Sequence, residues 1–165
     1  MVEKQNIKIR LAAENDFEPV SRIFAEENQY HAELVPDIVQ VADPIMTPEW
    51  FQKVLSNPVK KLFLAAINTE VVGLILVSLR TSGDDPIFKP RRFIYINEIA
   101  VAEAYRGQGI GGYLLGNIHQ WALEKGIVEI ELQVWEKNDR AINFYEKSGY
   151  KPFKKIMRCV VSDYE

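Results

Sequence analysis

Residues 105–112 read Tyr105, Arg106, Gly107, Gln108, Gly109, Ile110, Gly111 and Gly112. This stretch lies between an apolar, β-branched run over residues 93–101 and a helical pattern over residues 110–122. Backbone amides at the start of a helix, together with the positive end of the helix dipole, bind phosphate groups. Glycines permit the backbone angles of such a loop and the close approach of a ligand. We therefore predict a pyrophosphate-binding loop; the alternative is a tight turn whose glycines let the helix pack closely.

The spacing of Gly107, Gly109 and Gly112 also satisfies G-x-G-x-x-G, the dinucleotide-binding pattern. In that fold the first glycine closes the turn directly after the first strand of the chain, and further strand and helix repeats follow. Here residues 102–106 intervene after the strand, and too little sequence remains for a second half. A P-loop is excluded because no Gly-Lys-Ser/Thr follows. The context therefore argues against both of these phosphate-binding folds.

Outward from the glycine stretch, strand and helix patterns alternate. We expect strands over residues 7–11, 62–67, 71–79, 93–101, 127–134 and 150–161, and helices over residues 17–30, 48–57, 110–122 and 140–147. Asn15 and Asp16 offer capping oxygens to the first helix, and Thr47 offers one to the second. The strand, helix and strand over residues 93–134 predict a parallel pair with a right-handed crossover. Residues 81–92 are rich in glycine, proline and aspartate, which predicts a loop that is either a mobile lid or only a connection.

Composition indicates one globular domain over residues 1–165, with 47% hydrophobic and 26% charged residues. The net charge of −3 creates no field that attracts nucleic acid or an anionic membrane. Residues 1–20 contain no uninterrupted apolar stretch for a signal peptide or a membrane span. We therefore expect a cytoplasmic protein with no nucleic-acid partner and no membrane partner.

Cys159 is the single cysteine, so no disulfide can form within the chain and a cysteine-based zinc site would lack ligands. We expect no bound metal. Cys159 falls in the last predicted strand, where we expect a buried and inert thiol.

The pattern Arg106-x-x-Gly109-x-Gly111 resembles the acetyl-CoA pyrophosphate motif of the GCN5-related N-acetyltransferase (GNAT) family. A second block, residues 138–150, resembles the downstream motif of that family. The resemblance is specific over residues 93–153. It implies a single GNAT-type domain of the α/β class, with an α+β mixed sheet. Most strands of this sheet are antiparallel, and one parallel strand pair flanks the coenzyme A loop.

The resemblance implies that acetyl-CoA is the cosubstrate and that an amine attacks its thioester directly, through a tetrahedral oxyanion. It assigns cofactor binding to Ile99, Ala100, Val101, Arg106, Gly107, Gln108, Gly109, Ile110, Gly111, Gly112, Asn138, Ala141 and Tyr145. Backbone N–H groups at residues 99–101 occupy the place of the oxyanion donor. Tyr145 matches the tyrosine that protonates the leaving thiolate, and its alternative is a core aromatic. Asn138 could instead serve only as a helix N-cap, and Arg106 could instead be a solvated loop charge.

The attacking amine needs a base, and Glu98 is our candidate because it is an acid inside an otherwise apolar strand. Burial there would raise its pKa into a useful range; the alternative is an exposed edge charge or an ion pair. Gln133 stands where other family members place an acid, and an amide cannot act as a base.

Tyr30, His31 and Glu33 are candidate acceptor-binding residues, because the family often lines its acceptor pocket with this region. Further acids surround them, namely Glu26, Glu27, Asp37 and Asp43, and they favour a cationic amine, although a solvated helix face has the same composition. The expected function is N-acetylation of a primary amine on a small molecule or a peptide. The alternative is a non-catalytic acyl-CoA-binding regulatory module, against which the presence of Tyr145 argues. A homodimer is left open.

Overall fold

The computed structural model describes residues 6–83 and 85–164 of the chain. The chain forms two compact units, Met1–Gln133 and Val134–Glu165. The single domain expected over residues 1–165 stays a prediction.

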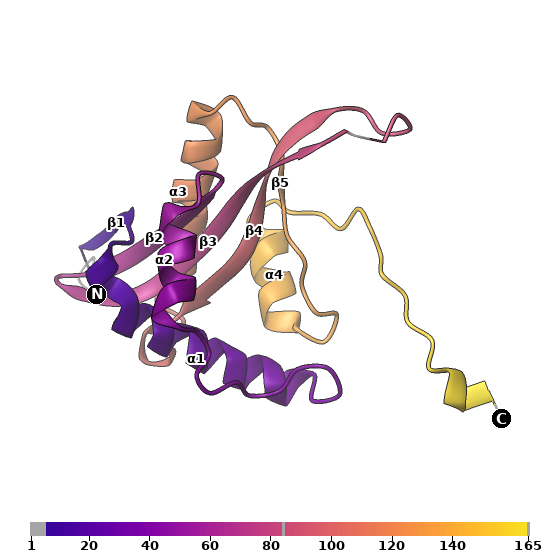
Figure 1. Cartoon of the computed structure of the whole chain (residues 1–165), viewed down its shortest axis with the longest axis horizontal. Coiled ribbons are helices and arrows are strands. Elements are labelled where there is room, and N and C mark those ends of the chain that lie inside the picture. Colours follow the sequence, from indigo (N-terminus) through magenta and orange to yellow (C-terminus); the bar gives the residue numbers. More distant parts are fainter. Residues whose placement is uncertain (1–5, 84, 165) are drawn as a thin grey trace. The chain divides into compact units, whose positions relative to one another are not determined.

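The first unit is built on a mixed β-sheet (Figure 1). In its described part the strands are β1 (Ile7–Leu11), β2 (Lys60–Ile67), β3 (Glu70–Ser82), β4 (Arg91–Val101) and β5 (Ile130–Glu131), in the spatial order β1-β2-β3-β4-β5. Neighbouring strands from β1 to β4 are antiparallel. β5 is parallel to β4, with Ile94 opposite Ile130. The predicted fold class, including one parallel strand pair, is therefore confirmed.

Helices cover both faces of this sheet. They are α1 (Phe17–Leu34), α2 (Pro48–Ser56) and α3 (Ile110–Glu124), with short 3-10 turns η1 (Glu14–Asp16) and η2 (Glu103–Tyr105). A buried cluster joins Ile23 of α1 and Phe51 of α2 to Leu64 and Leu74 of the sheet. On the opposite face, the ring of Trp121 on α3 packs edge-on against Phe63, with the ring centroids 5.9 Å apart. Alternate residues of one strand point to opposite faces, so the two sets of helices lie on opposite sides (Figure 1).

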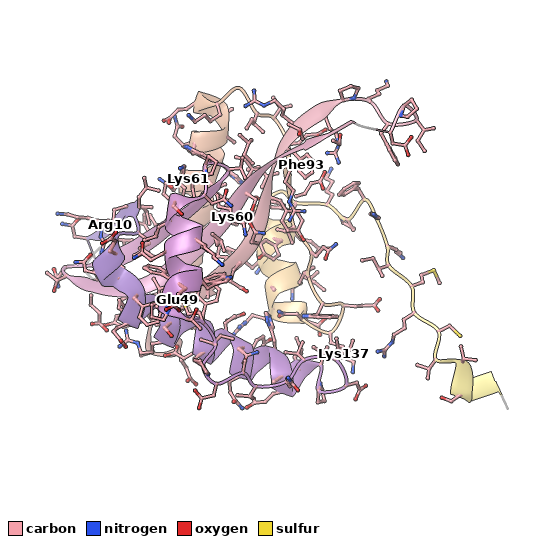
Figure 2. All side chains as sticks on the ribbon, in the orientation of Figure 1. Arg10, Glu49, Lys60, Lys61, Phe93 and Lys137 are labelled. Atoms are coloured by element: carbon pink, nitrogen blue, oxygen red, sulfur yellow. The ribbon has the colours of Figure 1, made fainter. Side chains whose placement is uncertain are left out.

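The entry into α1 differs from the prediction. The Asp16 carboxylate does not cap α1 but turns back, accepting hydrogen bonds from both terminal nitrogens of Arg10, each at 2.7 Å, and from the Ala13 N–H at 2.8 Å. This bidentate pair holds the pKa of Asp16 below its usual value. Figure 2 shows Arg10 beside this turn. The Thr47 cap of α2 is confirmed, because its Oγ1 accepts the Trp50 N–H at 3.2 Å.

The β3–β4 hairpin extends further than predicted. The strands pair as far as Ser82 opposite Arg91, so the connection shortens to residues 83–90, of which Asp84 lies outside the described residues. Stacking explains the extension: the Arg80 guanidinium lies 3.7 Å from the centre of the Tyr95 ring across the hairpin. Arg91 also pairs with Glu129 and Glu131, which ties the start of β4 to the chain around β5.

The second unit contains α4 (Asp139–Lys147) and a 3-10 turn, η3 (Val161–Tyr164). The strand predicted over residues 150–161 is wrong, since residues 151–160 have no regular secondary structure. Pro152 lacks a backbone donor, and the apolar residues that follow do not alternate, so the segment has no consistent apolar face. Cys159 is consequently exposed, and its predicted burial is also wrong. The strand predicted over residues 127–134 shortens to the two residues of β5.

No helix within residues 6–83 and 85–164 has the length and hydrophobicity needed to cross a membrane. The same residues contain no cluster of three or more histidine, cysteine and acidic side chains that could ligate a metal ion.

Candidate active site

The glycine loop connects the end of β4 to the start of α3. Gly107 and Gly109 adopt left-handed backbone angles, with φ values of 77° and 82°. Side chains other than glycine disfavour this region, so both glycines are needed for the shape of the turn. Gly109 is the N-cap of α3, and the Gly112 N–H already bonds to the Gly109 carbonyl at 3.0 Å. The amides of Ile110 and Gly111 therefore precede the hydrogen-bonded turns of the helix, where an anion can reach them.

Further glycines leave one face of α3 bare. Gly109, Gly112, Tyr113, Gly116 and Asn117 line an open groove of about 490 Å³. Apart from the adjacent residues and the backbone of α3 itself, no described atom lies within 4 Å of a Cβ built at Gly112 or Gly116. These two glycines are therefore not explained by close helix packing. Asn117 borders the groove, and its Oδ1 is buried without a hydrogen-bond partner among the described residues.

Gly73 on β3 has the packing role that those glycines lack. A Cβ at Gly73 would lie 3.1 Å from the Ile110 Cγ2 and 3.2 Å from the Ala100 carbonyl oxygen. The first turn of α3 thus rests directly on the sheet. This close approach fixes the helix start relative to β4.

A β-bulge changes the direction of β4 just before the site. Leu76 lies opposite Glu98 and Val77 opposite Ile96, so Asn97 is the extra residue. The Ser78 hydroxyl donates to the Asn97 Oδ1 at 2.5 Å and holds the bulge.

Beyond the bulge, β4 has an edge that faces away from β3. The Ala102 N–H bonds to the Val72 carbonyl of β3 at 2.9 Å. Backbone groups alternate in direction along a strand, so the N–H groups of Ile99 and Val101 point to the other edge, while that of Ala100 points to β3. The paired part of β5 reaches only Ile94 and Tyr95. The residues predicted to supply an oxyanion donor therefore include two N–H groups directed at this edge.

Glu98 lies at the same edge and is partly buried. Desolvation, followed by the negative charge of Glu27, raises the pKa of its carboxyl to about 8, although the Ile99 backbone N–H opposes the shift by a hydrogen bond. A carboxyl with this pKa exchanges a proton near neutral pH. The interpretation of Glu98 as a solvated edge charge does not fit this environment.

Glu27 on α1 is buried, at 9% exposure, and has a basic side chain near each oxygen. The His31 Nε2 lies 3.4 Å from Oε1, and the Arg106 Nη2 lies 3.6 Å from Oε2. The Arg106 guanidinium also lies 6.0 Å from the centre of the Tyr30 ring. Tyr30, His31, Glu98 and Arg106 thus come together around Glu27. Glu33 does not join them: it is exposed and accepts a hydrogen bond from Gln29.

The second block of the predicted site is a compact helix in the second unit. Asn138 is buried and caps α4, its Oδ1 accepting the Ala141 N–H at 3.1 Å. Tyr145 is also buried, and its ring packs against Tyr150, with the centroids 5.6 Å apart. Gly149, with a φ of 90°, ends the helix and brings Tyr150 back to Tyr145. The cap and the aromatic packing are present, and the cofactor roles of these residues stay predictions.

Comparison with known proteins settles the family. A family model described as "Acetyltransferase (GNAT) family" matches residues 20–150, which is most of the chain. The chain belongs to the GNAT family. The recognition of this family from the glycine loop and the block over residues 138–150 is therefore confirmed.

Among curated GNAT relatives, the thialysine N-epsilon-acetyltransferase of Bos taurus is 29% identical over 151 residues, covering 87% of this chain and 83% of the relative. The L-ornithine N5-acetyltransferase NATA1 of Arabidopsis thaliana is 36% identical over 74 residues, which is 45% of this chain and 32% of that protein. This second match thus spans only about a third of the ornithine enzyme.

Solved structures agree on the fold. A variant of a Bacillus halodurans protein superposes with a TM-score of 0.89 at 26% identity, covering 93% of this chain and 99% of that one. An aminoglycoside acetyltransferase from an uncultured soil metagenomic sample, crystallised with sisomicin, gives a TM-score of 0.66 at 23% identity, covering 93% and 94%. At that identity the second likeness shows the GNAT fold alone.

Sequence reasoning counted Glu27 among the acids of its region but did not assign it to the site, and it missed Asn117. A signal for Glu27 was available, because it follows Val20 by seven positions and Ile23 by four, and so lies on the buried face of α1. An acid on an apolar face is a candidate functional residue. For Asn117 we find no comparable signal in the sequence.

Proposed function

We propose that the protein is an acetyl-CoA-dependent N-acetyltransferase that acetylates a primary amine on a cationic small molecule. The observation that carries the proposal is the position of Glu98. This carboxyl, with its raised pKa, lies on β4 at the edge where backbone N–H groups are directed outward, and the same strand leads into the glycine loop.

The residues of the first unit fit coenzyme A. The amides at the start of α3 suit a pyrophosphate, and a Cβ at Gly112 or Gly116 would occupy open space in the groove. The buried Asn117 Oδ1 is an acceptor in need of a donor, which an adenine amino group or a pantetheine amide would supply. Bound there, acetyl-CoA would supply an activated acetyl thioester.

In this account the chain's own residues move two protons. Glu98 takes a proton from the incoming ammonium, directly or through water, since its pKa of about 8 lies near that required of a base at neutral pH. The outward N–H of Val101 donates to the acyl oxygen, because that of Ile99 already bonds to the Glu98 carboxyl. As the C–S bond breaks, Tyr145 is proposed to give its phenolic proton to the departing thiolate, as the family resemblance implies. The second proton, which the nitrogen loses as the amide forms, returns the phenolate to a phenol.

The acceptor class follows from charge. Once Glu98 has given up its proton, Glu27 and Glu98 carry two negative charges against the one permanent positive charge of Arg106, which favours a ligand that carries at least one ammonium group. The relatives' names, thialysine and ornithine acetyltransferase, describe acceptors of this class. A small diamine or basic amino acid is therefore favoured over a neutral amine.

The test is thiol release from acetyl-CoA across a panel of diamines, basic amino acids, aminoglycosides, neutral amines and a lysine peptide. We expect release with the cationic small amines. Tight acetyl-CoA binding without stimulation by any amine would support the non-catalytic regulatory module instead. Preference for the peptide would preserve the enzyme and overturn the proposed acceptor class.

A further inference from the structure

The Arg106 side chain reaches α1. Its Nε donates to the Val101 carbonyl oxygen at 3.1 Å, and its Nη2 lies 3.6 Å from the Glu27 Oε2. With only a quarter of the side chain exposed, the guanidinium lies between the end of β4 and α1. Its contacts are therefore made with the end of β4 and with α1, although its position in the motif suggests a phosphate ligand.

A second contact holds α1 against the same turn. The Glu26 Oε2 accepts the Glu103 backbone N–H at 2.7 Å. Two neighbouring acids of α1 thus bind the segment between β4 and α3, one through the backbone and one through Arg106. This arrangement fixes where Glu27 lies.

Glu27 needs such a partner because it is buried. A buried carboxylate without a cation or hydrogen bonds is strongly destabilised. The ion pair to His31 depends on protonation of the imidazole, whereas the guanidinium is charged at all relevant pH values. Arg106 is therefore the permanent counter-charge of Glu27.

We propose that Arg106 is a positioning residue: it holds the ionised Glu27 carboxylate in place beside Glu98, and the backbone amides of the glycine loop, not this guanidinium, bind the cofactor phosphates. The proposal rests on the proposed function for its kinetic consequences. The charged groups that face this point are Glu27 and His31 from α1, Glu98 from β4 and Arg106 from the loop.

The proposal predicts how the two binding steps respond. Loss of the guanidinium should leave the affinity for acetyl-CoA nearly unchanged, because the loop amides remain. It should weaken binding of a cationic acceptor, because Glu27 is no longer fixed. It should also lower the pKa of Glu98, because the Glu27 charge that raises this pKa is no longer held beside it.

The experiment compares Arg106→Gln and Arg106→Lys with Arg91→Gln. Arg91 is a matched control, because it is an ion-paired arginine at the far end of β4. Acetyl-CoA affinity is measured by calorimetry and the amine KM by thiol release. The Glu98 titration is followed by ¹³C-carboxyl NMR in the free protein.

For Arg106→Gln we expect an acetyl-CoA Kd within about twofold of wild type and an amine KM raised about tenfold, by analogy with a lost charged hydrogen bond. We also expect a Glu98 midpoint at lower pH, because Glu27 is no longer held beside it. Arg106→Lys should restore the midpoint in part, and Arg91→Gln should change none of the three. An acetyl-CoA Kd weakened tenfold with an unchanged Glu98 midpoint would overturn the proposal, and so would a variant identical to wild type. If no amine is acetylated by the wild-type protein, the proposed function fails, but the NMR titration still tests the position of Arg106.

Discussion

Glu27 and Glu98 form an electrostatically coupled pair across α1 and β4, in which the charge of the first raises the pKa of the second. Burial is the larger cause of that shift, so the pair combines two effects that favour a protonated carboxyl. A cation bound beside the two acids would oppose both effects by favouring the charged carboxylate. Under the proposed function, we therefore expect Glu98 to release its proton more readily when a cationic acceptor is bound.

The rate of the free enzyme should depend on the protonation of Glu98. A base acts as the carboxylate, so we expect kcat/KM to rise with pH through a midpoint near pH 8. Glu27→Gln removes the neighbouring negative charge and should move this midpoint to lower pH. The pH dependence of kcat/KM is measured with two amines of different basicity, because the ionisation of the amine also affects the rate. A midpoint that moves with the pKa of the amine, and shows no contribution from the enzyme, would contradict the role of Glu98.

Glu98 should also make the folded protein less stable at high pH. Its folded pKa of about 8 exceeds the ordinary value of 4.5, so between these values the folded state holds the extra proton. Stability contributed by the carboxyl is then present at low pH and is lost as pH rises toward 8 and beyond. Glu98→Gln cannot ionise, so we expect it to be more stable than wild type at pH 9, on the order of 2 kcal/mol.

Denaturant unfolding at pH 5 and pH 9 measures this difference. The variant and wild type should differ much less at pH 5, where the side chain at position 98 is largely neutral in the folded state of both proteins. An equal gain at both pH values would indicate better packing of the amide, and a loss at pH 9 would exclude the assigned desolvation.

Two glycines with different surroundings test the groove. Gly116→Ala places a methyl group in open space within a helix, so we expect a gain of about 0.5–1 kcal/mol in the free energy of unfolding, from helix propensity. The same methyl group should weaken acetyl-CoA binding if the cofactor lies along the groove. Calorimetry with acetyl-CoA checks this, and unchanged affinity would place the cofactor elsewhere.

Gly73→Ala is the contrasting variant. Its methyl group would lie 3.2 Å from the Ala100 carbonyl oxygen and 3.1 Å from Ile110, so we expect a loss of about 1–3 kcal/mol from overpacking. Thermal unfolding of the two alanine variants should therefore shift in opposite directions. A stabilised Gly73→Ala protein would show that α3 does not rest on β3 as described.

Tyr145→Phe tests the proposed acid. The phenol is required only for proton transfer to the sulfur, so turnover should fall by about 10²-fold while acetyl-CoA affinity is retained. Tyr150→Phe is the matched control, because it removes a hydroxyl from the ring that packs against Tyr145. Unchanged turnover in Tyr145→Phe would contradict the role of Tyr145 as the acid. The residue would then be a core aromatic, which agrees with its burial.

Local patterns predicted much of this fold. The Thr47 cap, the strands predicted over residues 62–67 and 71–79, the helix after the glycine loop and the parallel pair all depend on residues close in sequence, and all were confirmed. Wrong predictions arose where the outcome depends on distant partners. Asp16 had a capping position, but Arg10 of the preceding strand offered it a stronger, charged partner. Residues 150–161 had a strand-like composition but no regular apolar alternation.

The candidate site was predictable to the same extent. The glycine loop and Glu98 followed from a motif and from an acid in an apolar strand. The side-chain direction of Arg106 did not, because it is set by Glu27 on a helix far away in sequence. The bulge at Asn97, which aligns Glu98 with the open edge, depends on pairing with β3 and left no mark in the sequence.

The central claim, amine N-acetylation with Glu98 as the base, is tested most directly by mass spectrometry of a cationic amine incubated with acetyl-CoA at pH 8. For the wild-type protein we predict acetylated amine and free coenzyme A in equal amounts. For Glu98→Gln we predict at least about 10²-fold less of both, with acetyl-CoA still bound. Thiol release without acetylated amine, or full activity in Glu98→Gln, would contradict the account.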